Sequence, residues 1–316
     1  MSEFSQEVPE SYKIAGLEHK GRFVSPVKNT HRKEQYVYKD GEREYPRILK
    51  FLPLHSAHSE VIGSAVFKEL GFRTPETFYV EEDSKPAVIM EDLTPDFVAD
   101  LTYGEGGVMA DAKLRSEFQN TILAAILIGD YDRVPWNTLI KRDFSGVAHV
   151  DFGACCGSRA QGGYNGFSDS IDIEDIRHVI ADPYDLTKIT NTAYAEMIDI
   201  SSGEVKILMP DKIKKLVTGI QSLTDDKINS IVDLSGWPDN STEMGHELNK
   251  NFLFTTIAKL QEDLTYFKNP KTSDHIKTKR ALSTFTKIID DFNYDISAYF
   301  KYALKGRRDS IVKIFK

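Results

Sequence analysis

The sequence predicts an α+β protein of two lobes, a β-rich N-terminal lobe with one helix and a larger helical C-terminal lobe. Two observations predict this order. Up to about residue 92, short stretches alternate between apolar and polar residues, as strands do, around one stretch of helical periodicity. From about residue 111, helical periodicity prevails. The 316 residues suffice for two such lobes, which we place at 1–92 and 93–316.

The N-terminal lobe is predicted to contain five strands and a helix. Polar or acidic turns separate the strands, and Pro53 ends the third. The helix carries apolar residues at helical spacing, and Gly71 could end it. The expected strands are 21–27, 34–40, 47–53, 77–80 and 86–92, and the expected helix is 56–72.

The C-terminal lobe is predicted to begin with a long helix at 111–130. A short hairpin at 137–153, with its turn at 143–146, follows it. The rest of the chain is expected to be a helical extension. Its predicted helices are 210–223, 246–267 and 281–305.

Composition limits the class of protein. The net charge of −8 argues against general nucleic-acid binding. The polar N-terminus does not resemble a signal peptide, and the longest apolar run, 121–129, is too short for a transmembrane segment. The two cysteines, Cys155 and Cys156, are adjacent and fit a reducing compartment. We therefore expect a cytoplasmic protein, or one delivered into a host cytosol as a bacterial effector.

The charge is unevenly distributed. Ten Lys/Arg stand against five Asp/Glu between residues 13 and 50, and eleven against five between 271 and 316. The segment between them, 51–270, is acidic. Solvated surface charge explains this pattern, but two basic ends also fit contact with an inositol polyphosphate or an anionic membrane. The basic residues in question are His19, Lys20, Arg22, Lys28, Arg32 and Lys33, with Lys305, Arg307, Arg308 and Lys313.

Three polar residues stand in otherwise apolar surroundings near the predicted hairpin. Asp132 and Asn137 are five residues apart, and Asp151 lies fourteen further on, within Asp-Phe-Gly. The hairpin would bring Asn137 and Asp151 together, where carboxylate and amide oxygens suit Mg²⁺. Asp132, on the loop before it, could accept a hydroxyl proton. A capped turn between two strands is the simpler alternative.

Two charged residues complete a set that phosphoryl transfer from ATP requires. Lys50 lies on the third strand, on the face opposite Leu49 and Phe51. Glu60 lies in the first turn of the following helix, with Glu69 as a competing acid. A lysine on the phosphates, held by a helix carboxylate, is a recurring part of such sites.

Asp132, Asn137 and the Asp-Phe-Gly triplet at 151–153 resemble the catalytic and metal-binding loops of the protein-kinase-like superfamily. No His-Arg precedes Asp132, so the match is to an atypical branch similar to phosphatidylinositol 3- and 4-kinases. The stretch 34–53 resembles the second and third strands of type II phosphatidylinositol 4-kinases. The resemblance covers about residues 20–155 and implies a two-lobed kinase-like fold.

The resemblance implies roles for these residues. Lys50 would bind the ATP phosphates with Glu60 as its partner, and Asp132 would be the catalytic aspartate. Asn137 and Asp151 would bind Mg²⁺, or Mn²⁺ in its place.

It also implies an adenine site. Met90 would line its back, and the backbone of Glu91 and Leu93 would meet the adenine edge. The candidate phosphate loop, 27–35, contains no glycine, but offers backbone amides and the side chains of Asn29 and Thr30.

The phosphate acceptor is left open. The segment 154–179 lacks the Ala-Pro-Glu of protein kinases and carries only Arg159 before an acidic run, which favours a protein acceptor over an anionic lipid. We therefore expect an atypical Ser/Thr protein kinase, regulated by an inositol phosphate or anionic lipid. A phosphoinositide kinase is the alternative. A pseudokinase and a nucleotidyl-transferring protein of the same fold are further ones.

Overall fold

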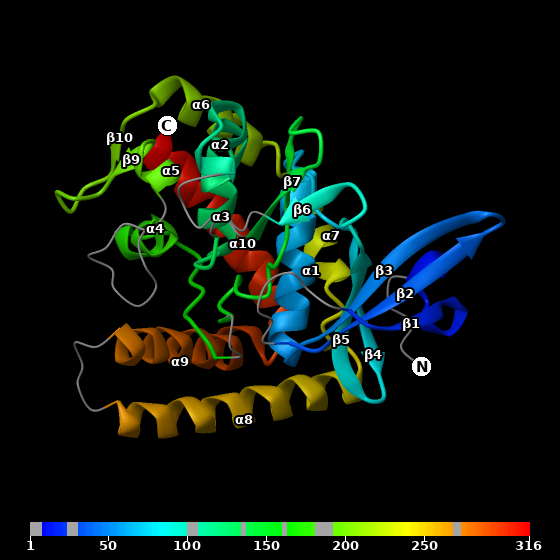
Figure 1. Cartoon of the computed structure of the whole chain (residues 1–316). Coiled ribbons are helices and arrows are strands. Elements are labelled where there is room, and N and C mark those ends of the chain that lie inside the picture. The colour runs from blue at the N-terminus through cyan, green and yellow to red at the C-terminus, as the bar shows by residue number, and fades with distance from the viewer. Residues whose placement is uncertain are drawn as a thin grey trace.

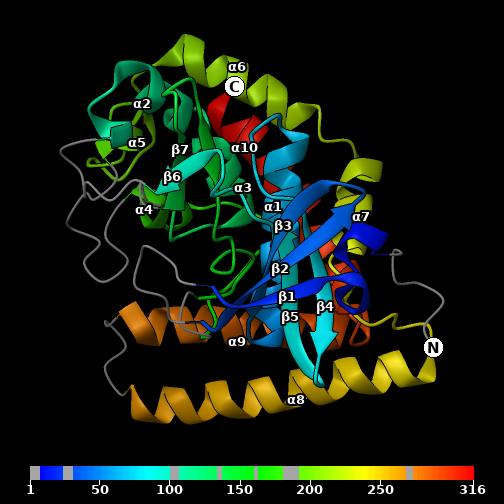
Figure 2. The ribbon, with the colours of Figure 1, turned by 45° about the vertical axis from the view of Figure 1, so that its right-hand side comes forward.

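The computed structural model describes residues 8–23, 31–99, 107–133, 137–159, 163–180, 192–267 and 273–316. It has the predicted α+β architecture in two lobes (Figure 1). A β-sheet and one long helix form the N-terminal lobe, and helices dominate the C-terminal lobe. In the turned view, the sheet lies in front of that helix, and two long helices run beneath both lobes (Figure 2).

The N-terminal sheet has five antiparallel strands in the order β1-β2-β3-β5-β4. Two short 3₁₀ turns, η1 (Glu10–Tyr12) and η2 (Ile14–Gly16), precede it. Its strands are β1 (Glu18–Arg22), β2 (Lys33–Asp40), β3 (Arg43–Phe51), β4 (Thr77–Glu82) and β5 (Lys85–Glu91).

A two-residue turn sets the register between β2 and β3. Gly41 has a φ of +61° at the first central position of this turn, where glycine is strongly favoured. The turn pairs Asp40 with Arg43, and the ladder continues to Lys33 opposite Lys50. Since side chains alternate between faces, Lys50 shares a face with Ile48 while Leu49 lies on the other, as predicted.

Helix α1 (Leu54–Glu69) connects β3 to β4 and packs against the sheet face that carries Ile48. The helix begins directly after Pro53. The first amide N–H groups of a helix have no partner within the helix, so a proline, which has no N–H, is tolerated at this end. Glu60 therefore lies in the second turn, so its predicted place in the first turn is wrong. Gly71, with a φ of +85°, follows the helix end as expected.

The C-terminal lobe is built around the helices α3 and α10, with a small antiparallel sheet in the order β6-β7-β8. Its first half contains β6 (Phe97–Ala99), η3 (Gly107–Met109), α2 (Ala112–Gln119), α3 (Ile122–Ile128), β7 (Thr138–Lys141), β8 (Val147–His149) and α4 (Ile173–Ile180). The second half contains α5 (Thr192–Ala195), β9 (Ile198–Asp199), β10 (Lys206–Ile207), α6 (Pro210–Gln221), α7 (Asp225–Leu234), α8 (Glu243–Tyr266), α9 (Ser273–Phe292) and α10 (Ile296–Phe315).

Two predicted helices are each divided in the structure. The helix expected at 111–130 breaks at Asn120, where the Thr121 hydroxyl donates to the carbonyl of Phe118. The helix expected at 281–305 breaks between α9 and α10, because Asn293 and Tyr294 adopt positive φ angles. The hairpin at 137–153 forms as predicted, as β7 and β8.

Over the stretches that the structure describes, none of the helices is both sufficiently long and sufficiently apolar to cross a membrane.

Candidate active site

Lys50 lies at the interface between the two lobes and is 2% exposed. Its Nζ donates to Oε2 of Glu60 and to Oδ1 of Asp151, both at 2.7 Å. Burial alone would lower the pKa of Lys50, but the two carboxylates outweigh it and raise that pKa above its ordinary value. Lys50 therefore stays charged and ties β3 to α1 and to the C-terminal lobe.

Glu60 uses both carboxylate oxygens. While Oε2 accepts from Lys50, Oε1 accepts the backbone N–H of Phe152 at 3.0 Å. The competing acid, Glu69, is partly exposed on the same helix and pairs with Lys227. Glu60 is thus the acid that fixes α1 relative to the Asp-Phe-Gly segment.

Asp132 and Asn137 are positioned by the end of α3. Gly129 ends this helix in a left-handed conformation, and the chain turns to the buried Asp130, whose Oδ1 accepts the N–H of Asp132 at 3.2 Å. Nδ2 of Asn137 donates to the backbone carbonyl of Asp132 at 2.8 Å, which leaves the amide oxygen as an acceptor. Burial, with the charges of Asp130 and Asp151, raises the pKa of Asp132 to about 7.

Asp151 follows β8 with a φ of +63°, and its side chain is 47% exposed. The hairpin brings it to Asn137, because Val150 N–H donates to the carbonyl of Asn137 at 3.0 Å. Desolvation opposes its ionisation, but the Lys50 ammonium prevails and lowers the pKa of Asp151 well below its usual range. Asp151 is therefore a carboxylate at neutral pH, and part of it faces solvent.

Phe152 anchors this segment in the core. It is fully buried, and its ring lies 4.8 Å from that of Phe67 on α1. The guanidinium of Arg133 lies over the Phe152 ring, 4.8 Å from its centroid, and Nη2 of Arg133 donates to the carbonyl of Val150 at 2.5 Å. These contacts fix the backbone next to Asp151, whose Oδ1 lies 2.7 Å from Nζ of Lys50.

The donor set at Asn137 and Asp151 fits Mg²⁺ or Mn²⁺. Within the described parts of the chain, no cluster of three or more His, Cys, Asp or Glu could hold a metal ion by itself. Mg²⁺ commonly takes only one or two protein oxygens and completes its shell with substrate phosphates and water. An amide oxygen and an ionised, half-exposed carboxylate match that need.

The residues predicted for adenine binding lie at the end of β5. Met90 is buried opposite Ile48 on the face that carries Lys50, and Leu93 is buried nearby. The amide of Glu91 donates to the carbonyl of Glu76, and its carboxylate pairs with Arg73 at 2.5 Å. Their roles stay predictions. Asn29 and Thr30 lie outside the described residues.

Sequence reasoning assigned Lys33 only to a general basic cluster. In the structure this lysine begins β2, directly opposite Lys50, on the same face of the sheet. Burial, and then the Lys50 ammonium, lower the pKa of Lys33, while Asp151 and Glu60 act in the opposite direction. The sequence does indicate this pairing: a two-residue turn at Gly41 pairs Asp40 with Arg43, and the same register places Lys33 opposite Lys50.

In the part of the chain that the structure describes, several cations of the two basic ends pair with acids. At the N-terminal edge, Glu34 pairs with His19 and Arg32, and Glu18 pairs with Lys20. At the C-terminal end, Lys305 and Arg308 both pair with Asp225.

Arg307 is fully buried, where it donates to the carbonyls of Ile126 and Leu127. Its predicted place in a surface cluster is wrong: it holds α10 against α3.

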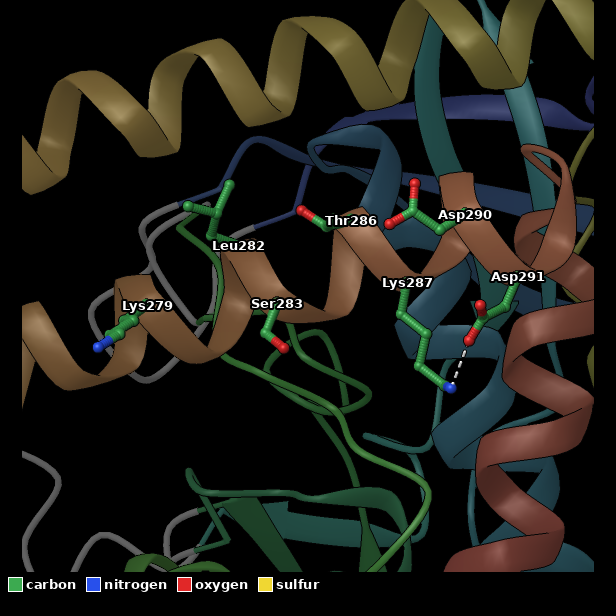
Figure 3. Close-up of a pocket in the computed structure, with 7 residues that line it drawn as sticks. All are labelled: Lys279, Leu282, Ser283, Thr286, Lys287, Asp290 and Asp291. Atoms are coloured by element: carbon green, nitrogen blue, oxygen red, sulfur yellow. Dashed lines mark hydrogen bonds and ion pairs between the residues drawn. The ribbon is translucent and has the colours of Figure 1, made fainter.

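A separate hollow lies on α9, lined by side chains between Lys279 and Asp291 (Figure 3). Lys287 and Asp291 form an ion pair at its edge. None of the predicted site residues that the structure describes lines this hollow, so it is distinct from the site around Lys50.

The strand order and the five side chains Lys50, Glu60, Asp132, Asn137 and Asp151 together define a two-lobed kinase-like fold. The lysine on the third strand pairs with a glutamate of the next helix and with the aspartate of Asp-Phe-Gly, and the asparagine lies directly before β7. The finer resemblance to type II phosphatidylinositol 4-kinases stays a prediction.

No family model matches the chain, and no curated protein sequence matches it. Among solved structures it is similar to the Helicobacter pylori proinflammatory kinase CtkA, with a TM-score of 0.48 and 18% identity over 84% of this chain and 96% of that one. It is also similar to a Shewanella oneidensis MR-1 structure of the toxin–antitoxin system HipA and HipB with operator DNA. There the TM-score is 0.29 and the identity 14%, over 97% of this chain and 70% of that one.

Proposed function

We propose that this protein is an ATP- and Mg²⁺-dependent phosphotransferase that acts on Ser/Thr hydroxyls of a protein. One observation carries the proposal: Lys50 is buried between Glu60 and Asp151 at 2.7 Å from each, with Asn137 beside Asp151. A structural ion pair needs neither the half-exposed second carboxylate nor the adjacent amide oxygen. Phosphoryl transfer needs both, for charge neutralisation and positioning.

The side chains have separate roles under this proposal. Lys50 binds the phosphates of ATP, and Glu60 holds Lys50 in place. Asn137 and Asp151 would hold Mg²⁺, which supplies positive charge to the phosphates when bound. The acceptor hydroxyl oxygen attacks the γ-phosphorus, the bond from that phosphorus to the bridging oxygen breaks, and ADP leaves. Asp132 accepts the hydroxyl proton.

The charges after Asp-Phe-Gly support a protein acceptor. Three arginines that the structure describes near this segment already pair with acids: Arg159 with Asp274, Arg177 with Glu174, and Arg280 with Asp172 and Asp175. A phosphoinositide headgroup would have to displace these acids to reach the cations. A neutral Ser or Thr side chain needs no such cation.

The acceptor can be tested with γ-labelled ATP and Mg²⁺, offered in parallel to generic protein substrates and to phosphatidylinositol vesicles. We expect label in protein, and we expect Lys50→Met to abolish it. Lys85→Met, an exposed lysine of the same sheet, is the matched control and should retain transfer. If the wild-type protein transfers label to no acceptor, the proposal is refuted. If it transfers label to lipid alone, the protein is a phosphoinositide kinase and not a protein kinase.

We also propose that an inositol polyphosphate or an anionic lipid regulates transfer through the N-terminal basic residues. Since Glu18 and Glu34 already pair with these cations, a polyanion must compete with them, and its effect should weaken as salt rises. Transfer rates that do not change on addition of inositol hexakisphosphate at low salt would contradict this.

A further inference from the structure

Helix α1 contacts the rest of the protein on three sides. Glu60 and Gly63 face the Asp-Phe-Gly segment: the Glu60 carboxylate accepts the Phe152 N–H at 3.0 Å, and a Cβ on Gly63 would lie 2.6 Å from that of Phe152. Ala57 and Val61 pack in the core beneath the sheet. The third side meets α7 and the loop that follows it. The position of Glu60 therefore depends also on elements that are distant from the N-terminal lobe in sequence.

Two histidines form the contact on this third side. At about 100° per residue, His58 lies roughly 160° around the helix from Glu60. Its Nδ1 donates to the carbonyl of Ser235 at 2.6 Å, and its ring stacks on that of Trp237 with the centroids 3.9 Å apart. The ring of His55, which precedes His58 by one turn, lies 5.9 Å from the same indole. Both histidines thus bind α1 to the loop between α7 and α8.

Trp237 connects these histidines to the long C-terminal helices. It is 8% exposed, and its ring lies 5.4 Å from that of Phe252 on α8 and 6.2 Å from that of Phe300 on α10. The preceding Gly236 has a φ of +77°, which favours glycine, and a Cβ there would lie 3.0 Å from the ring of Tyr79. Because packed interiors contain few voids, they transmit displacements. A shift of Trp237 would therefore displace the histidine side of α1.

We propose that Trp237 is a positioning residue for phosphoryl transfer, which acts through α1 to hold Glu60 against Lys50. This rests on the proposed function and adds to it a residue that lies outside the site around Lys50. The Glu60 carboxylate holds the Lys50 ammonium at 2.7 Å, and a misplacement of about 1 Å can lower a rate about 100-fold. The C-terminal helices then serve the reaction as well as the stability of their own lobe.

Steady-state kinetics of single and double variants of the full chain test this. Trp237→Ala should lower kcat/KM for ATP by up to about 100-fold, and Trp237→Phe, which keeps an aromatic ring, should lie closer to the wild-type protein. In a Glu60→Gln protein, Trp237→Ala should lower kcat/KM by less than about threefold further, because the residue through which it acts is already lost. Phe315→Ala is the matched control. Phe315 is buried on α10, about 22 Å along the helix axis from Phe300, and its truncation should leave kcat/KM unchanged.

Amide hydrogen exchange gives a second measurement that does not require activity. The Phe152 N–H is bonded to Glu60, so displacement of α1 should speed its exchange. We expect faster exchange of this amide in Trp237→Ala than in Phe315→Ala, after correction for their free energies of unfolding measured in urea. If Trp237→Ala does not fold, Gly236→Ala takes its place, because the added Cβ displaces the same loop without truncating the indole.

The outcomes separate this inference from the proposed function. A wild-type protein that transfers phosphate to no acceptor refutes the proposed function, and exchange of the Phe152 amide then decides whether Trp237 positions α1. If Trp237→Ala and Glu60→Gln lower kcat/KM independently, so that their effects multiply, Trp237 is a core residue only and the inference is overturned. Equal effects of Trp237→Ala and Phe315→Ala on kcat/KM and on exchange of the Phe152 amide would also overturn it.

Discussion

Replacing Glu60 by glutamine perturbs the link between α1 and the Asp-Phe-Gly segment with almost no change of shape. The carboxylate of Glu60 is 1% exposed and has two partners, Lys50 Nζ at 2.7 Å and the Phe152 N–H at 3.0 Å. Glutamine can satisfy one of them with its amide oxygen. Its NH₂ group then faces either an ammonium or an N–H, and both are donors.

The magnitude follows from burial. Removing one partner of a buried ion pair costs about 3–5 kcal/mol. Lys50 keeps Asp151 as a second partner, and we therefore expect the low end, about 3 kcal/mol, for the loss in free energy of unfolding. Because Lys50 would no longer be fixed relative to the phosphates, we expect kcat/KM for ATP to fall about 100-fold, as for a misplacement near 1 Å.

Urea denaturation and steady-state kinetics measure the two effects. Glu69→Gln is the matched control, since Glu69 lies on the same helix in a partly exposed pair with Lys227 and should change stability by less than about 1 kcal/mol. The reasoning is refuted if Glu60→Gln behaves like Glu69→Gln in both assays. If Glu60→Gln loses activity but not stability, Glu60 still positions Lys50 for the reaction. The Glu60–Lys50 ion pair then does not contribute to the free energy of unfolding.

Gly63→Ala on α1 would place a Cβ 2.6 Å from that of Phe152, so we expect about 1–3 kcal/mol of destabilisation and a lower kcat/KM. The control Gly219→Ala on α6 meets nothing within 4 Å and should leave activity unchanged, and equal effects of the two would contradict the packing argument. Stability should also depend on pH, because burial lowers the pKa of His55 to about 4 and that of His58 to about 3 from an ordinary 6.5. Below 6.5 the unfolded chain binds more protons than the folded one. Stability should therefore fall by up to about 1.4 kcal/mol per pH unit for each histidine as the pH drops toward 4. Urea unfolding at pH 7 and pH 5 that gives equal free energies would argue against this.

Local patterns were sufficient to predict much of the candidate site. The spacing of Asp132, Asn137 and Asp151 around a hairpin predicted that Asn137 and Asp151 would meet, and the structure brings them together. Strand alternation predicted the face of Lys50. Each of these depends on a period or a short turn, which the sequence encodes directly.

Features that depend on distant contacts could not be predicted. His55 and His58 on α1 pack against Trp237, which lies 182 and 179 residues further along the chain, and no local pattern indicates that contact. The burial of Arg307 follows from the docking of α10 on α3 and looks, in sequence, like any basic residue of a C-terminal helix. Lys33 is an intermediate case, because the turn at Gly41 fixed its partner once both strands were placed.

The central claim is that the γ-phosphate of ATP is transferred at the site around Lys50 and Asp151. Phosphorus NMR of the protein with ATP, Mg²⁺ and a generic protein substrate tests it most directly, because it identifies which bond of ATP is broken. We predict that ADP and a phosphate ester appear together with the wild-type protein and with Asp143→Asn, an exposed control on the β7–β8 turn, but not with Asp151→Asn. AMP and pyrophosphate as products, or undiminished transfer by Asp151→Asn, would contradict the account.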